Sequence, residues 1–167
     1  MRWYNLLNGF VQTVMEFKPE YYAVLESLST GAKTVEEITR VVDMEPHDVE
    51  AVLPALMGQG LVERREKGLL FKKEAYALTE RGWEVLYKWR EEVKERVEKA
   101  AELRRAGRVR EAEEVLAPVA SVLPLMLTLG LLDMALYAAA LGQLATLDEA
   151  AELGVEAFDS GDFDVGD

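Results

Sequence analysis

Residues 34–82 read TVEEITRVVDMEPHDVEAVLPALMGQGLVERREKGLLFKKEAYALTERG, and this stretch decides the fold. It begins with a capping box, in which the Thr34 hydroxyl can accept a hydrogen bond from the Glu37 amide while the Glu37 side chain reaches back. The apolar spacing that follows predicts a short helix ending near residues 43–44. Its buried face is expected to consist of Val35, Ile38, Val41 and Val42.

A second helix is expected to start at residues 45–46, because Pro46 suits an early helical position, where its missing amide donor costs little. The helix ends at the Gly-Gln-Gly sequence of residues 58–60. Pro54 falls inside it and removes one internal hydrogen bond, so we expect a bend there. The apolar stripe of this helix comprises Val49, Val52, Leu53, Leu56 and Met57.

The next residues predict a charged β-hairpin followed by a long helix. Residues 61–66 are expected to form one strand, residues 67–68 a tight turn and residues 69–78 the returning strand. Thr79 then caps a helix that begins at Glu80.

Two helices are expected before this stretch. Apolar residues at helical spacing predict an amphipathic helix over residues 5–17. Pro19 starts another helix that runs to about Ser29, with Tyr22, Leu25 and Leu28 on its inner face. The sequence therefore predicts a mainly α protein with a small β-hairpin. The order of helix, short helix, helix, hairpin and helix is that of a winged helix-turn-helix domain.

Two motifs within this order resemble known families. Residues 53–63, LPALMGQGLVE, resemble the end of the recognition helix in PadR-type regulators, where an internal proline and a Gly-Leu-Val exit recur. Residues 76–82, YALTERG, resemble the Leu-Thr-x-x-Gly junction that follows the wing in the PadR and MarR families. The resemblance covers roughly residues 20–95 and lacks the His-Gly-Tyr-like turn that PadR proteins carry after the first helix. It implies a transcriptional regulator that binds DNA as a dimer.

The region after Gly82 predicts helices for oligomerisation. A charged helix with an aromatic seam is expected to continue to about Arg105, where Gly107 breaks it, and a further helix is expected over residues 110–116. Helices of this kind resemble the post-wing helices through which such regulators dimerise. The residues predicted to form the homodimer contact are Trp83, Leu86, Tyr87, Trp89, Val93, Val97, Leu125, Leu129, Leu132 and Leu136.

Residues 119–147 leave two alternatives open. Over 119–141 the only charged residue is Asp133, and a run of that length is enough to cross a bilayer. Against a membrane span stand Asp133 itself and the interruptions at Pro124, Gly130 and Gly142. We favour a buried helical hairpin that turns near residues 128–130.

The composition excludes most enzyme classes. The chain has no cysteine and one histidine, His47, so thiolate chemistry and sites with two imidazoles are absent. It also lacks a P-loop and a G-x-G-x-x-G sequence. We therefore expect no catalytic residue, no metal and no cofactor. The lack of an apolar leader favours a cytoplasmic protein, and the abundance of Glu, Lys and Arg over Asn and Gln favours a thermophilic source.

The net charge of −12 is concentrated in an acidic tail, which carries eight acids and no Lys or Arg from Asp148 onward. This pattern divides the chain into an N-terminal bracing helix (1–18), the winged helix-turn-helix (19–82), the oligomerisation region (83–147) and the tail (148–167).

The charges in the middle of the chain bear on DNA binding. The expected third helix presents Asp48 and Glu50 outward, and its only candidate contact to a base or phosphate is His47. The hairpin is better supplied with basic residues, namely Arg64, Arg65, Lys67, Lys72 and Lys73. We therefore expect a dimeric regulator that contacts duplex DNA mainly through a basic wing. The alternative is a winged-helix module that binds a protein through its acidic third helix, with or without a membrane tether at 119–141.

Overall fold

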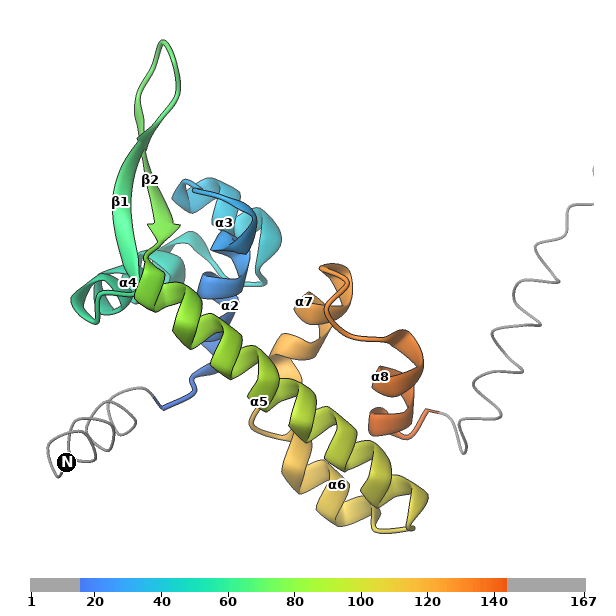
Figure 1. Ribbon diagram of the computed structural model, residues 1–167. Coiled ribbons are helices and arrows are strands. Elements are labelled where there is room, and N and C mark those ends of the chain that lie inside the picture. The colour runs from blue at the N-terminus through green and yellow to red at the C-terminus, as the bar shows by residue number, and fades with distance from the viewer. Residues whose placement is uncertain (1–15, 144–167) are drawn as a thin grey trace, which may run out of the picture. The chain divides into compact units, whose positions relative to one another are not determined.

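The computed structural model describes residues 16–143, which form helices and one two-stranded antiparallel hairpin, as expected (Figure 1). The bracing helix expected over residues 5–17 falls almost wholly outside the described residues, and the acidic tail falls entirely outside them. The chain divides into two compact units between Glu91 and Glu92, inside a continuous helix. The expected boundary lay after Gly82.

Three α-helices precede the hairpin in the described part of the first unit, at the positions that the sequence predicts. They are α2 (Pro19–Ser27), followed by a 3-10 turn η1 (Leu28–Thr30), then α3 (Val35–Val41) and α4 (Pro46–Gly58). Pro54 lies inside α4, and the helix continues through it to Gly58. The apolar faces meet in a core that includes Tyr22, Val24, Leu25, Leu28, Ile38, Val49, Leu53 and Leu56.

The predicted capping box at the start of α3 is confirmed. The Glu37 amide donates to the Thr34 hydroxyl at 3.3 Å, and the Thr34 amide donates to Glu37 Oε1 at 3.5 Å. Both contacts satisfy backbone donors that the first helical turn leaves without partners.

The hairpin differs from the expected one in the length of its turn. Strand β1 (Val62–Lys67) pairs with β2 (Lys73–Leu78) in a register that runs from Val62 opposite Leu78 to Lys67 opposite Lys73. Leu69, Leu70 and Phe71, which we expected in the returning strand, lie instead in the loop. Strand residues gain from a pleated surface that neighbours half bury, and the loop residues are all exposed and have no such neighbours.

A second contact anchors β2 on its other edge. The Lys33 amide donates to the Tyr76 carbonyl at 2.9 Å, and the Tyr76 amide donates to the Lys33 carbonyl at 2.8 Å. The segment between η1 and α3 thus acts as a one-residue third strand. It fixes the base of the hairpin to the helices.

The Leu-Thr-x-x-Gly motif forms the junction between the hairpin and α5 (Glu80–Arg105). The Thr79 hydroxyl donates to the Gly60 carbonyl at 2.5 Å and accepts from the Gly82 amide at 3.0 Å. The Thr79 amide donates to the Leu61 carbonyl at 3.1 Å. A Cβ on Gly82 would lie far inside the contact distance of that same carbonyl oxygen. The motif needs glycine there because the helix crosses directly over the Leu61 backbone.

A buried ion pair joins α2 to α5 within the first unit. The Glu26 side chain is fully buried, and Arg90 donates to both of its carboxylate oxygens, at 2.5 and 3.3 Å. Burial raises the pKa of the neighbouring Tyr22, and the negative charge of Glu26 raises it further. The bidentate geometry offsets the cost of removing the two charges from water.

The second unit contains the rest of α5, then α6 (Val109–Leu116), the 3-10 turn η2 (Ala120–Val122), α7 (Leu123–Thr128) and α8 (Met134–Leu141). The expected turn near residues 128–130 is confirmed, with Gly130 at a φ of +71°. Across residues 16–143 no helix combines the length and the apolar character that crossing a bilayer requires. The apolar run over 119–141 is divided between the short elements η2, α7 and α8.

Two arginines of α5 hold the ends of the shorter helices of this unit. Arg96 donates to the Val115 carbonyl at 3.1 Å, near the end of α6, and Arg104 donates to the Ala140 carbonyl at 2.6 Å, near the end of α8. Cations are favourable at helix C-termini, where carbonyl groups lack partners. These basic side chains therefore serve helix packing.

Replacing Gly82 tests the junction. Gly82→Ala should lower the free energy of unfolding by about 1–3 kcal/mol, because the added methyl group must displace the Leu61 backbone. The matched control is Gly58→Ala in α4, where an added Cβ meets nothing within 4 Å. That control should be neutral or stabilising by up to about 1 kcal/mol. Urea denaturation of both variants makes the comparison, and equal effects would contradict the close approach.

Candidate functional site

The basic residues predicted to bind DNA are gathered on the hairpin. Arg64, Arg65 and Lys67 lie on β1, Lys73 begins β2, Lys72 precedes it, and all five are exposed. The register sets like charges opposite each other at the end next to the loop, with Glu66 facing Glu74 and Lys67 facing Lys73. Like charges directly opposite each other destabilise a strand pair. This end of the hairpin therefore needs other partners.

Exposed ion pairs within the hairpin supply part of that compensation. Arg64 Nε lies 2.9 Å from Glu74 Oε1, and Lys72 Nζ lies 3.2 Å from Glu66 Oε2. Arg65 also pairs with a carboxylate of its own strand, Glu63, at 2.7 Å. Exposed pairs of this kind contribute about 0–1 kcal/mol each. A phosphate group can therefore replace these carboxylates at little cost.

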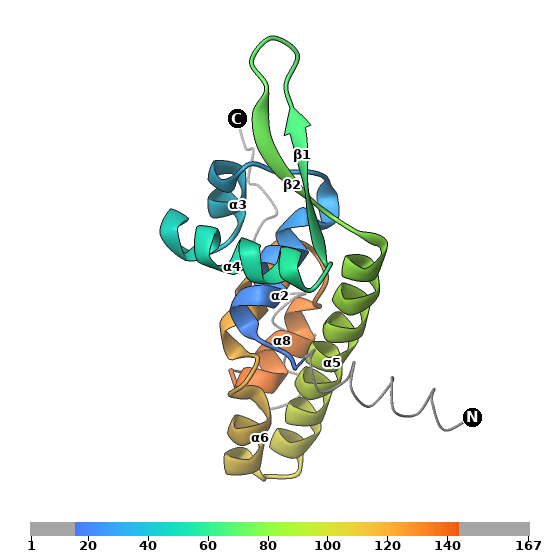
Figure 2. The same ribbon diagram turned by 90° about the vertical axis from the view of Figure 1, so that its left-hand side faces the viewer.

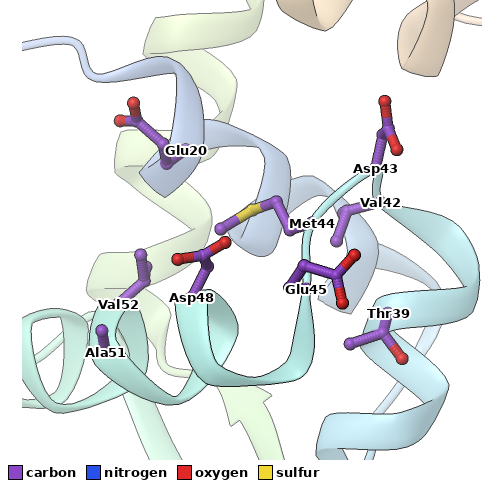
Figure 3. Close-up of a pocket in the computed structure, with 9 residues that line it drawn as sticks. All are labelled: Glu20, Thr39, Val42, Asp43, Met44, Glu45, Asp48, Ala51 and Val52. Atoms are coloured by element: carbon purple, nitrogen blue, oxygen red, sulfur yellow. The ribbon is translucent and has the colours of Figure 1, made fainter.

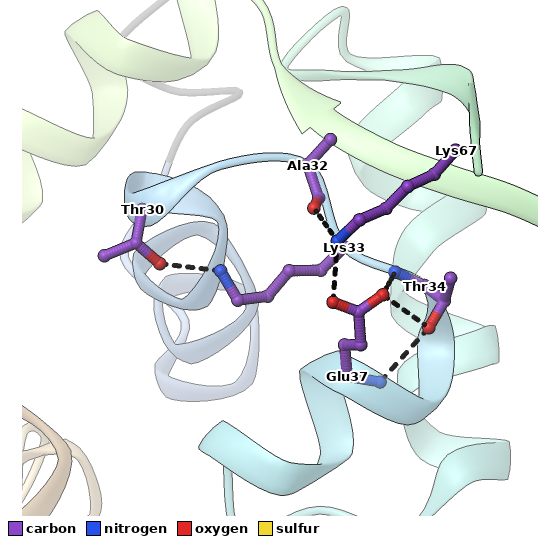
Figure 4. Close-up of polar contacts among 6 residues, drawn as sticks. All are labelled: Thr30, Ala32, Lys33, Thr34, Glu37 and Lys67. Atoms are coloured by element: carbon purple, nitrogen blue, oxygen red, sulfur yellow. Dashed lines mark hydrogen bonds and ion pairs between the residues drawn. The ribbon is translucent and has the colours of Figure 1, made fainter. Parts of the chain in front are cut away.

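Lys67 has a different role from its basic neighbours. Its ammonium group donates to Glu37 Oε2 at 2.7 Å and to the Ala32 carbonyl at 3.1 Å, so it ties the hairpin to the start of α3 (Figure 4). The hydrogen bond from Lys67 lowers the pKa of Glu37, and the bond from the Thr34 backbone adds to the effect. Close by, Lys33 Nζ donates to the Thr30 hydroxyl at 2.6 Å. Lys67 thus anchors the end of β1 next to the loop.

The hairpin ends in an apolar tip, which we define as Leu69, Leu70 and Phe71. In both views the loop that carries the tip extends beyond α2, α3 and α4 (Figure 1 and Figure 2). Gly68 starts the loop with a φ of +116°, and a Cβ there would collide with the Phe71 carbonyl oxygen. The sequence predicted these three residues as part of the returning strand and not as a projecting tip. The signal that could have indicated a tip is an apolar triplet between Lys67-Gly68 and Lys72-Lys73.

The exposed face of α4 carries acids. His47, Asp48 and Glu50 are all exposed, and His47 Nε2 lies 3.3 Å from Asp48 Oδ1. The one candidate DNA contact on this helix therefore sits against a carboxylate. Acids on this face repel phosphates, whose neutralisation supplies much of the affinity for DNA.

An acidic pocket of about 580 Å³ lies between α2, α3 and α4 (Figure 3). Carboxylates contributed by α2, by the α3–α4 connection and by α4 surround it, while apolar side chains form part of its lining. The carboxylates are Glu20, Asp43, Glu45 and Asp48, and the apolar side chains are Val42, Met44, Ala51 and Val52. This combination suits a cationic group attached to an apolar stem. Within residues 16–143 no three His, Cys, Asp or Glu side chains are placed to hold a metal ion.

The structure separates the residues predicted for dimerisation into two groups. Five are buried within the chain itself, namely Leu86, Trp89, Val93, Val97 and Leu132. The rest are at least partly exposed, namely Trp83, Tyr87, Leu125, Leu129 and Leu136. The Trp83 and Tyr87 rings lie 5.7 Å apart, and Tyr87 is 54% exposed. Dimerisation stays a prediction, and within residues 16–143 the Trp83–Tyr87 pair leaves part of its aromatic surface exposed.

Replacing Lys67 by methionine tests the anchor. Because the folded protein lowers the pKa of Glu37, the pair stabilises the fold above the ordinary glutamate pKa of about 4.3. That stabilisation disappears as the pH falls through the lower, folded-state pKa. Lys67→Met should therefore reduce the free energy of unfolding at pH 7, and the difference from wild type should shrink at about pH 3.

The control for this experiment is Lys88→Met. Lys88 is exposed and makes no ion pair with any residue from 16 to 143. Urea denaturation at both pH values should show no pH-dependent difference for the control. A Lys67→Met effect that did not change with pH would contradict the pairing with Glu37.

The resemblance of this chain to known families depends on its motifs alone. The likeness to PadR and MarR regulators rests on the internal proline of α4, the Gly-Leu-Val exit and the Leu-Thr-x-x-Gly junction. The structure explains the physical role of the junction. Searches against protein-family models and against curated proteins return no match to this chain.

Proposed function

We propose that residues 19–82 form a winged helix and that the chain is a transcriptional regulator that binds duplex DNA through the hairpin, its wing. The supporting observation is the projecting hairpin, whose segment 63–74 carries five basic and three acidic residues. It is anchored at its base through Lys33 and Tyr76 and at its outer end through Lys67. An anchored two-stranded ribbon is a shape that fits a DNA groove.

The basic residues of the wing have two different roles. Arg64, Arg65, Lys72 and Lys73 are the phosphate contacts, because they are exposed and their pairs, where they have them, are weak. Lys67 supports the wing through its bond to Glu37. The acidic α4 stays outside the phosphate contact, so this mode of binding differs from one in which the third helix reads the major groove.

The proposal includes a homodimer. The resemblance to PadR and MarR regulators implies one, and the partly exposed Trp83–Tyr87 pair on α5 offers an aromatic contact of the kind that protein interfaces favour. Two wings presented by one dimer raise the affinity for a duplex through effective concentration.

The salt dependence of binding tests this function. The wild-type chain should bind duplex DNA at low salt, with log K falling linearly as log salt concentration rises. Arg64→Ala with Arg65→Ala removes two phosphate contacts and should reduce that slope by about 2. Fluorescence anisotropy with mixed-sequence duplexes measures both quantities.

The matched control for the wing variant is Arg105→Ala with Arg110→Ala. These two arginines are exposed, lie outside the hairpin and change the net charge by the same amount. The control should retain the wild-type slope. No binding to any duplex at low salt would overturn the proposal, as would equal losses in the wing variant and the control.

A second candidate function is binding of a basic protein segment, and the acidic pocket favours it. Its carboxylates complement Lys or Arg, and Met44 and Val52 can pack against the methylene stems of those side chains. In this second function the acids of α4 contribute to binding. In DNA binding they make no favourable contact.

Neutralising the pocket separates the two candidates. Glu45→Gln with Asp48→Asn should tighten DNA binding, because two like charges near the phosphates are lost. The same change should weaken binding of a lysine-rich peptide if the pocket is a peptide site. Glu95→Gln with Glu98→Gln on the exposed side of α5 is the control. Unchanged DNA affinity with lost peptide binding would favour the second candidate.

A further inference from the structure

The tip of the hairpin exposes apolar surface that the fold does not use. Leu69 is 101% exposed, Leu70 91% and Phe71 83%, the three highest values among the large exposed apolar side chains of residues 16–143. Burying such side chains is favourable because it removes apolar surface from water. Single exposed apolar residues are ordinary, but three adjacent ones at the end of an anchored ribbon indicate an interaction surface.

We propose that the tip is a wedge that enters the minor groove of duplex DNA and partly unstacks a base step. This inference rests on the proposed DNA binding and names the way in which the wing engages the duplex. Leucine and phenylalanine side chains are suited to wedging between base pairs. Unstacking the bases is unfavourable, and the added contact between protein and DNA offsets it.

The positions of the basic residues favour a groove over a flat surface. Lys67 and Lys72 flank the tip directly, whereas Arg64 and Arg65 lie three to four residues behind Gly68 on β1. At about 3.3 Å per strand residue, these arginines sit on the order of 10 Å behind the loop. When a ribbon is inserted into a groove, phosphates line both of its sides. The arginines behind the loop can therefore contact those phosphates. A membrane that meets the tip would leave them in water.

The strand end next to the loop is fixed to the fold. Lys67 donates to Glu37 and to the Ala32 carbonyl, and the Gly68 backbone lies close to the Phe71 carbonyl. A loop with an anchored end loses less conformational entropy on insertion than a free loop.

A variant that removes only the apolar surface tests the wedge. In the full-length chain, Leu69→Ser, Leu70→Ser and Phe71→Ser together keep every charge. Because the three side chains are exposed, the triple variant should melt at the same temperature as the wild type. The triple variant should bind mixed-sequence duplex about tenfold more weakly, a difference of about 1.4 kcal/mol. Its salt slope should equal that of the wild type, because no phosphate contact is lost.

Plasmid relaxation by a topoisomerase provides the readout that depends on unstacking. Unstacking by a wedge unwinds the duplex, so the wild-type chain should shift the linking number of a relaxed plasmid and the triple variant should not. Leu69→Met with Leu70→Met keeps an apolar tip and should retain the shift.

The other outcomes are distinct from one another. If wild type and triple variant bind DNA equally and neither shifts the linking number, the wedge is wrong and the proposed DNA binding stands. If the wild type binds no duplex, both fail. If the wild type instead floats with phosphatidylserine vesicles and the triple variant does not, while no plasmid is unwound, the tip is a membrane contact and the wedge is overturned.

Discussion

The contact of Thr79 and Gly82 with the backbone of Gly60 and Leu61 is the constraint on which the first unit depends. It brings together the end of α4, the start of β1, the end of β2 and the start of α5. The Thr79 hydroxyl donates to the Gly60 carbonyl while it caps α5, so it fixes the start of this helix to the segment that joins α4 to β1. The missing Cβ of Gly82 then lets the helix approach to backbone contact, which no other residue type permits.

With the base fixed in this way, the hairpin has a buried part next to the helices and an exposed part at its loop. Ala75, Tyr76, Ala77 and Leu78 are buried, and the bridge to Lys33 holds their strand. Between Lys67 and Lys73 the loop residues are exposed, and they bury no apolar surface against the part of the chain that the structure describes. Their apolar side chains stay in contact with water in the monomer. Burying them in a complex would be favourable.

Electrostatics separates two faces of the same unit. Arg64, Arg65 and Lys72 on the hairpin form exposed ion pairs with Glu74, Glu63 and Glu66. Such pairs are weak, so these basic groups can exchange a carboxylate for another anion. Among residues 16–143 the acids around the pocket form no ion pair with Lys or Arg, and Asp48 has an exposed contact with His47. A single polyanion cannot satisfy both faces, so the proposed functions use different surfaces.

The sequence by itself determined the helices, the capping box and the existence of a hairpin, because these depend on local spacing, capping residues and glycine or proline positions. It also identified Arg64, Arg65, Lys72 and Lys73 as exposed basic residues, since charge is read directly. Only the tertiary structure decided that Lys67 is an anchor and that residues 69–71 form a tip. Both facts depend on what lies near the residue in space: Lys67 finds Glu37 thirty positions earlier in the chain, and the register that places Lys67 opposite Lys73 sets the loop length. The burial of Leu86, Trp89, Val93 and Val97 was likewise decided by packing, because an apolar seam on a helix has the same spacing whether it faces its own chain or a second copy.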